Sequence, residues 1–155
     1  MSYARLVRIL LHKRKATTML KVLPIQTKAE QESLCLRCNI KFDPDLLAYV
    51  ASVNGETVGM CQFRVTGNGG EIYDIATVSD RDEPSDIKSR EASDFEALFV
   101  MGRGALNFID LCGVKKAVYL GHAADEALIR AIGFKKDVDG VFKIDLEGFF
   151  TDHCH

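Results

Sequence analysis

Hydrophobic and polar residues alternate along the middle of the chain with a period of two, which is typical of half-buried strands. The runs LLAYVASV (46–53) and ETVGMCQFRV (56–65) are joined by Asn54-Gly55, a dipeptide that strongly favours a two-residue hairpin turn. A second turn, TGNGG, leads into the run EIYDIATV (71–78). The pattern therefore predicts three consecutive antiparallel strands.

The period changes after the acidic segment that follows these strands. Apolar and small residues recur there at helical spacing, and Gly113 is predicted to close the helix at its C-cap position. Ser93 and Glu96 have the spacing of a capping box, which predicts that the helix begins at this point. The predicted helical stripe consists of Phe95, Leu98, Phe99, Gly102, Ala105, Leu106 and Ile109.

Five further segments complete the predicted fold, an α/β (α+β) arrangement of a mixed, mostly antiparallel sheet flanked by helices. The element order is β-α-β-β-β-α-β-α-β-β, in one domain over 19–155 that follows a basic extension, 1–18. The five segments are a strand over 17–25 ended by Pro24, a helix over 27–39 with Thr27 as N-cap, a strand over 115–121, a helix over 125–133, and a hairpin over 135–146 that turns at Asp139-Gly140.

Composition narrows the function classes. The formal net charge is −2, which gives no reason to expect a nucleic-acid partner. No apolar run approaches the roughly 18–20 residues of a membrane span, so we expect a cytoplasmic protein with no membrane partner. Five cysteines without disulfide-framework spacing predict free thiols. Residues 1–21 carry bases and no acid, and form either an amphipathic helix for a membrane or partner surface, or a solvated extension.

Four segments, taken in order, resemble the GNAT N-acetyltransferase superfamily. They are AYVASVNGETVGMCQF, EIYDIATV, GVKKAVYL and DEALIRAIGF, and they lie within roughly 19–146. The resemblance implies the GNAT acyl-CoA N-acyltransferase fold, acetyl-CoA as cosubstrate, and direct transfer of the acyl group to an amine. The acceptor would be a small-molecule or peptide amine. It leaves open whether the protein is a homodimer.

The resemblance also implies where the cosubstrate would bind. The fourth and fifth strands of the family splay apart, and pantetheine pairs with the fourth, here Ile75, Ala76 and Thr77. Pyrophosphate sits on the start of the next helix, over a loop of the form Gln/Arg-x-x-Gly-x-Gly/Ala. Arg90 would take the leading position, but no glycine follows it, and a helix that caps itself is the alternative reading. The pyrophosphate candidates are Arg90, Phe95, Glu96 and Ala97.

Catalytic candidates follow from the same resemblance, which implies a base and an acid. Glutamate is frequent on the fourth strand, so Glu71 or Asp74 is the candidate base; because they are three apart, we expect them on opposite faces. Ile129 stands where the family often has a tyrosine acid. The hydroxyls of the strand residues Tyr73 and Tyr119 are substitutes, and His122 lies near the family's frequent asparagine. The leading candidates are Glu71, Tyr73 and His122.

Two other functions compete with the enzyme. The first is a GNAT-fold binding or regulatory module that has lost catalysis, since the glycine-free loop departs from the family pattern. The second is a zinc-stabilised interaction domain built on Cys35-x-x-Cys38 and the terminal His153-Cys154-His155. Because Cys35 and Cys38 fall inside a predicted helix rather than on a knuckle, we expect no metal.

Overall fold

A computed structural model describes residues 18–82, 84–121 and 125–150, and its elements follow the predicted order. The basic extension up to residue 17, His122 and the terminal His-Cys-His therefore lie outside the described residues. The elements are β1 (Leu20–Pro24), α2 (Lys28–Arg37), β2 (Leu47–Val53), β3 (Glu56–Thr66), β4 (Gly69–Thr77), α3 (Ile87–Leu111), β5 (Lys116–Tyr119), α4 (Glu126–Ile132), β6 (Lys135–Lys136) and β7 (Phe142–Asp145).

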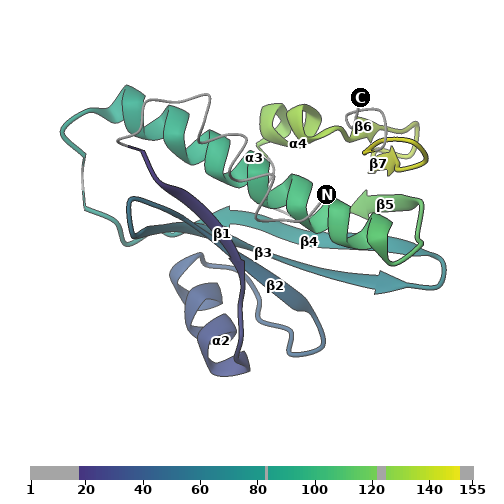
Figure 1. Cartoon of the computed structure of the whole chain (residues 1–155), viewed down its shortest axis with the longest axis horizontal. Helices are drawn as coiled ribbons and strands as arrows, with labels where there is room; N and C mark the ends of the chain where they lie inside the picture. The colour runs from purple at the N-terminus through teal and green to yellow at the C-terminus, as the bar shows by residue number, and fades with distance from the viewer. Residues whose placement is uncertain (1–17, 83, 122–124, 151–155) are drawn as a thin grey trace.

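The strands form one mixed sheet in the order β1-β2-β3-β4-β5-β7-β6, in which β4 and β5 are parallel and the other pairs are antiparallel. Helices α3 and α4 cover one face, and α2 lies on the other (Figure 1). The β2–β3 hairpin turns at Asn54 and Gly55, whose φ angles of 52° and 82° are those of the predicted two-residue turn. The fold class predicted from the sequence is confirmed.

The α3 face holds the larger apolar core, and two glycines set how closely α3 approaches it. A Cβ on Gly70 of β4 would lie 2.6 Å from side-chain atoms of Ile109, and one on Gly102 would lie 2.5 Å from Ile132 of α4. Cβ atoms essentially never approach so closely, so a side chain at either position would force Ile109 or Ile132 to shift. Close packing of α3 on β4 fixes the helix over the strand that carries the candidate site.

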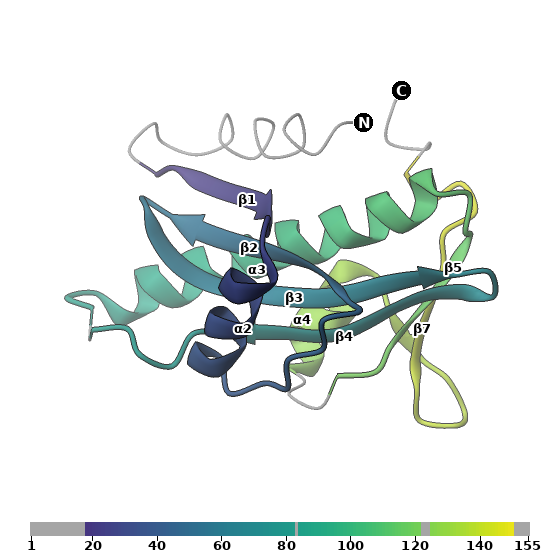
Figure 2. The ribbon, with the colours of Figure 1, turned by 90° about the horizontal axis from the view of Figure 1, so that it is seen from below.

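Helix α2 is attached to the opposite face through a buried polar cluster. Gln31 donates to Gln62 Oε1 at 2.9 Å, and the Cys35 thiol donates to the same oxygen at 3.3 Å. Gln62 in turn donates to the Lys41 carbonyl at 2.8 Å. These bonds satisfy the buried amides, so the cluster stabilises one docking position of α2. Figure 2 looks onto this face: α2 lies over β3 and the end of β4, and no described helix covers β5 or β7.

The start of α3 differs from the sequence prediction. The helix begins at Ile87, with Asp86 as N-cap accepting from the Ser89 amide at 3.1 Å, so the capping box at Ser93 and Glu96 is wrong. Both Asp86 and Ser93 are acceptable caps by residue type. Ion pairs of Arg81 and Arg90 with Glu56, which is distant in sequence, favour the longer helix. At the other end Cys112 is the C-cap, and Gly113 follows it in a left-handed conformation, φ 86°.

Candidate active site

Strands β4 and β5 separate half-way along β4. They pair from Gly70 opposite Ala117 to Ile72 opposite Tyr119, and the Leu120 amide donates to the Ile72 carbonyl at 2.7 Å. Strand β4 then continues to Thr77 without further pairing to β5. Among the described residues, the edge of β4 that faces away from β3 therefore has no strand partner from residue 73 onwards. We call this opening the β4–β5 gap.

A β-bulge marks the point of separation. Gln62 pairs with Asp74 while Phe63 pairs with Ile72, so Tyr73 is an extra residue without a partner on β3. The bulge reverses the alternation of side chains beyond it. Gln62 faces α2, and Arg64, two residues on, shares that face; their cross-strand partners are Asp74 and Glu71. The expectation that these two acids lie on opposite faces is therefore wrong.

Glu71 and Tyr73 meet on the α2 face of the gap. Glu71 Oε1 accepts from Arg64 Nε at 2.6 Å and from the Tyr73 hydroxyl at 3.1 Å, and the Arg64 guanidinium lies 5.6 Å from the centre of the Tyr73 ring. Partial burial and the hydrogen bond to Glu71 raise the pKa of Tyr73. Both donors use the same oxygen of Glu71, and neither bonds to the other oxygen, Oε2.

Tyr119 lies on the opposite side of the gap. Its ring is buried in the α3-side core, and its hydroxyl accepts a long hydrogen bond, 3.4 Å, from the Ile75 amide. Burial raises the pKa of Tyr119 to about 12, so the hydroxyl stays protonated at neutral pH. A Cβ on Gly121 would lie 2.5 Å from this hydroxyl and 2.2 Å from the Tyr73 carbonyl oxygen. The glycine therefore lets the chain pass beside the gap.

The open edge of β4 presents alternate backbone groups. The Val78 amide donates to the Val58 carbonyl at 2.9 Å, so Val78 and, by alternation, Ala76 direct their backbone groups toward β3. Ile75 and Thr77 direct theirs toward the gap. Of the three residues proposed to pair with pantetheine, Ile75 and Thr77 thus direct backbone groups toward the gap, and the pairing itself stays a prediction.

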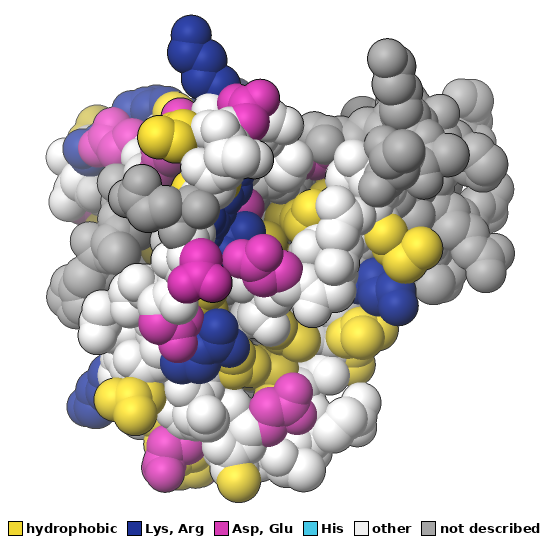
Figure 3. All heavy atoms as spheres, turned by 90° about the vertical axis from the view of Figure 1, so that its left-hand side faces the viewer, with side chains coloured by type: hydrophobic (Ala, Val, Ile, Leu, Met, Phe, Trp, Pro, Cys, Tyr) yellow, Lys and Arg dark blue, Asp and Glu magenta, His cyan; other side chains and the backbone are white. Residues whose placement is uncertain are grey.

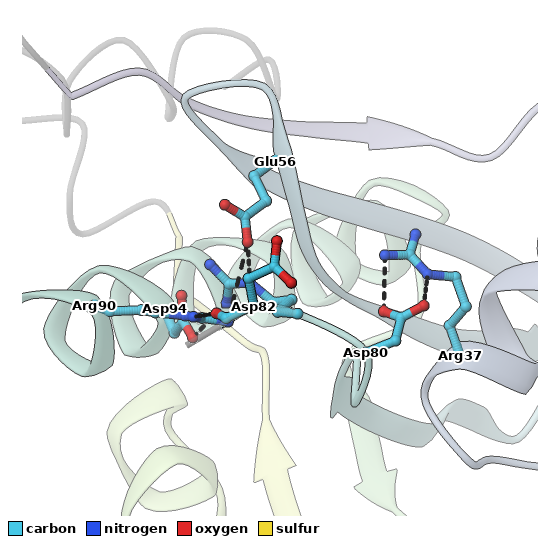
Figure 4. A network of polar contacts seen from close by, with 7 residues as sticks. Arg37, Glu56, Asp80, Asp82, Arg90 and Asp94 are labelled. Atoms are coloured by element: carbon cyan, nitrogen blue, oxygen red, sulfur yellow. Dashed lines mark hydrogen bonds and ion pairs between the residues drawn. The ribbon is translucent and has the colours of Figure 1, made fainter. Parts of the chain in front are cut away.

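Three described residues between β4 and α3, namely Asp80, Arg81 and Asp82, take part in a network of polar contacts (Figure 4). The Arg81 guanidinium, with a side chain only 9 % exposed, lies 2.6 Å from Glu56 of the hairpin turn and 2.7 Å from Asp94 of α3. Arg90 donates to the Asp82 carbonyl and lies 4.0 Å from Glu56. Since Arg90 and Asp94 lie in the first two turns of α3, these contacts stabilise the early start of the helix. Sequence reasoning did not predict the role of Arg81 in joining these segments. The available signal was a single base between two acids, Asp80 and Asp82.

The solved structures that resemble this architecture include three acetyltransferases. They are the ribosomal-protein-S18-alanine N-acetyltransferase of Escherichia coli (TM-score 0.51, 83 % of this chain and 94 % of that one), a Bacillus subtilis acetyltransferase in complex with CoA (0.53, 82 % and 99 %) and a Brucella melitensis GNAT family acetyltransferase in complex with acetyl-CoA (0.50, 81 % and 87 %), each 14 % identical. The chain has the GNAT fold. No protein-family model and no curated protein sequence matches it.

Two of these neighbours are in complex with CoA or acetyl-CoA, whose pantetheine part carries amide groups. An amide-bearing arm needs backbone partners on an unpaired strand edge, and Ile75 and Thr77 supply them. The Ile75 amide is held by the Tyr119 hydroxyl at 3.4 Å, a weak contact that an arm entering the gap can replace.

The pyrophosphate part does not fit the residues proposed for it. Arg90, Phe95, Glu96 and Ala97 lie inside α3, where backbone amides bond to carbonyls four residues earlier, as the Arg90 amide does to Asp86 at 3.2 Å. Phe95 lies eight residues, about 12 Å, beyond the true start of the helix. These amides therefore have no capacity for phosphate. At the true helix start, the carboxylate of Asp86 occupies the position that favours an anion.

The described cysteines and helices concern two further predictions, that on a zinc site and that on a membrane span. Burial raises the pKa of Cys35 to about 12 and that of Cys38 to about 11, so both are thiols rather than thiolates. In the part of the chain that the structure describes, no group of three or more His, Cys, Asp or Glu residues is placed to hold a metal ion. None of the described helices is long and apolar enough to cross a bilayer.

Proposed function

We propose that the protein is an N-acyltransferase that transfers an acetyl or other acyl group from a CoA thioester to an amine by direct attack. The observation that carries this proposal is the β4–β5 gap, with an open strand edge, Tyr119 on the α3 side and Glu71 on the α2 side. Thioester and amine would meet from opposite faces of the sheet. The amine nitrogen forms a bond to the acyl carbon as the carbon–sulfur bond breaks.

The residues at the gap have complementary roles in this reaction. The Tyr119 hydroxyl, protonated at neutral pH, donates a hydrogen bond to the departing thiolate. The proton lost by the ammonium passes to Glu71 directly or through water. Tyr73 and Arg64 position the Glu71 carboxylate through its other oxygen. His122, which lies outside the described residues, stays a candidate for the same proton transfers.

Binding of acetyl-CoA tests the first half of the proposal. Isothermal titration should show binding of acetyl-CoA and of S-acetyl-pantetheine with dissociation constants within about fivefold, because the described residues form no pyrophosphate cradle at the predicted position. Failure of both compounds to bind at millimolar concentration would contradict the proposal.

Catalysis is tested by Tyr119→Phe, with CoA release measured over a panel of amines. We expect turnover to fall about 100-fold, typical for loss of a positioned acid, with little change in acetyl-CoA affinity. Tyr49→Phe is the matched control, since Tyr49 is another buried tyrosine of the sheet, on β2 and away from the gap. Equal losses in the two variants would mean that Tyr119 acts only through packing.

A GNAT-fold module without catalysis is the second candidate, and the structure of α3 favours it. A conventional pyrophosphate site is replaced by two turns of helix fixed by Arg81 and Arg90. In that case acyl-pantetheine compounds or amines would bind in the gap, but no CoA would be released. The titration and the CoA-release assay together therefore distinguish a binding module from an enzyme.

A further inference from the structure

The α2 face of the sheet carries a second feature, a groove over β5, β7 and β6. Two adjoining cavities of about 720 and 320 Å³ share Asn68, Lys116, Lys143 and Ile144 in their walls. We call them together the lysine groove, because their lining includes Lys115, Lys116, Lys135, Lys136 and Lys143, against three acids, Glu71, Asp137 and Asp145.

Strand alternation explains why Lys116, Lys135 and Lys143 share this face. Along β7, Phe142 and Ile144 enter the α3-side core, so Lys143 points to the opposite face. Lys143 lies between Val118 of β5 and Lys135 of β6 in the register of the sheet. Two lysines thus stand directly opposite each other on adjacent strands, an arrangement that is unfavourable unless anions lie near them, and Asp137 and Asp139 supply these only for Lys143.

The lysines differ in how far the fold neutralises them. Three form ion pairs within the chain: Lys115 with Asp110 at 2.7 Å, Lys136 with Glu126 at 3.2 Å, and Lys143 with Asp139 at 2.8 Å and Asp137 at 3.0 Å. Over residues 18–82, 84–121 and 125–150, no carboxylate lies within 4.0 Å of the ammonium of Lys116 or Lys135. Asp145, across from Lys116 on β7, instead accepts from the Glu147 amide at 2.9 Å.

The groove and the β4–β5 gap are contiguous. Glu71 and Val118 line the groove, and they pair one position before Ile72 and Tyr119, where β4 and β5 separate. One step along a strand is about 3.3 Å. A ligand whose amine lies at Glu71 therefore extends directly over the lysines.

We propose that the lysine groove binds acidic residues of a peptide whose N-terminal amine is the acyl acceptor in the gap. The placement of the amine rests on the proposed function; the binding of acidic residues does not. From β5 to β6 the groove crosses two strand spacings, about 10 Å, which an extended peptide covers in three residues. Lys116, Lys143 and Lys135 stand on three successive strands along this path, which favours several spaced carboxylates over one phosphate. Acidic residues are expected at the positions just after the amine.

Fluorescence anisotropy with the full chain and no CoA tests the groove alone. The probe is a peptide with a free N-terminal alanine, four glutamates and a dye at its C-terminus, compared with the same peptide carrying glutamines. We expect the glutamate peptide to bind at least tenfold more tightly. The double variant Lys116→Glu with Lys135→Glu should lose at least tenfold in affinity for it.

The matched control carries the same change of charge elsewhere. Lys21→Glu with Lys41→Glu alters two exposed lysines, one on the edge strand β1 and one in the segment after α2. We expect its affinity to stay within threefold of wild type. Equal affinity for the two peptides, equal losses in the two double variants, or displacement of the peptide by submillimolar inorganic phosphate would overturn the inference.

Mass spectrometry of the peptide after incubation with acetyl-CoA separates this inference from the proposed function. A peptide that binds in the groove but gains no acetyl group would contradict the transferase and leave the acidic-peptide site intact. Bound acetyl-CoA without peptide binding would contradict the groove alone.

Discussion

Basic side chains gather at two regions of the molecule, and the fold treats them differently. Near the start of α3, the guanidinium groups of Arg37 and Arg81 each contact a carboxylate within 2.8 Å. Figure 3 shows this end of the molecule, where acidic side chains stand beside the basic ones. In the lysine groove, by contrast, Lys116 and Lys135 have no such partner among the described residues.

The comparison distinguishes two kinds of basic side chain: arginines that stabilise the fold through ion pairs, and lysines whose charge is available to a ligand. A guanidinium forms a planar fork that suits two carboxylates at once, and Arg81 uses it to join the β2–β3 turn to α3. The charge of Arg81 is thus already paired with two carboxylates, and its side chain is only 9 % exposed, which disfavours a phosphate there. The exposed lysines of the groove contribute little to stability and keep their charge available. An anion site sought at the start of α3, as the resemblance directs, is therefore less favoured than one at the groove.

The largest effect that follows from this comparison concerns stability. Arg81→Met should lower the free energy of unfolding by about 3 kcal/mol, because it leaves Asp94 partly buried without its partner. Asp94 Oδ1 is already buried without a hydrogen-bond partner among the described residues. Lys116→Met, the matched change in the groove, should alter the same quantity by less than about 0.5 kcal/mol. Urea denaturation measures both, and similar values for the two would remove the distinction.

The sequence predicted most of the fold because alternation, helical spacing and turn dipeptides are local signals. It did not predict the bulge at Tyr73, although a signal was present. Ile72 and Ile75 both enter the α3-side core at a spacing of three, which strict alternation forbids. The bulge in turn decides that Glu71 and Asp74 share a face.

The start of α3 and the lysine groove depend on contacts that no local pattern carries. Asp86 and Ser93 are equally good caps, and Arg81 and Arg90 favour the earlier one through Glu56, which is distant in sequence. The lysines of the groove fall in three separate segments. They become neighbours only because the sheet order places β7 between β5 and β6. Sequence reasoning preferred Tyr73 to Tyr119 as a catalytic candidate. Which tyrosine hydroxyl faces the gap depends on the order and pairing of the strands, and no local pattern shows this.

An intermediate effect concerns acid stability. The ion pair with Arg81 lowers the pKa of Glu56 below its ordinary value. A carboxylate with a lowered folded-state pKa stabilises the protein above its unfolded pKa, about 4.3, and this contribution is lost as pH falls through the folded value. The wild-type melting temperature should therefore fall more steeply below pH 4.5 than that of Arg81→Met. Parallel curves in calorimetry between pH 7 and pH 3 would contradict this role of Glu56.

The smallest expected effect concerns Arg37. It tests whether burial, rather than ion pairing itself, makes the contribution of Arg81 to stability large. Arg37 binds Asp80 through two hydrogen bonds, 2.8 and 3.0 Å, a better geometry than many buried pairs. Its side chain is 36 % exposed, against 9 % for Arg81, so water stabilises both ions when the pair is broken. Arg37→Met should therefore shift the melting temperature by no more than about 2 °C, and 0.5 M NaCl should abolish that shift. A loss as large as that of Arg81→Met would mean that the ion pairs themselves, irrespective of burial, hold this end of the molecule together.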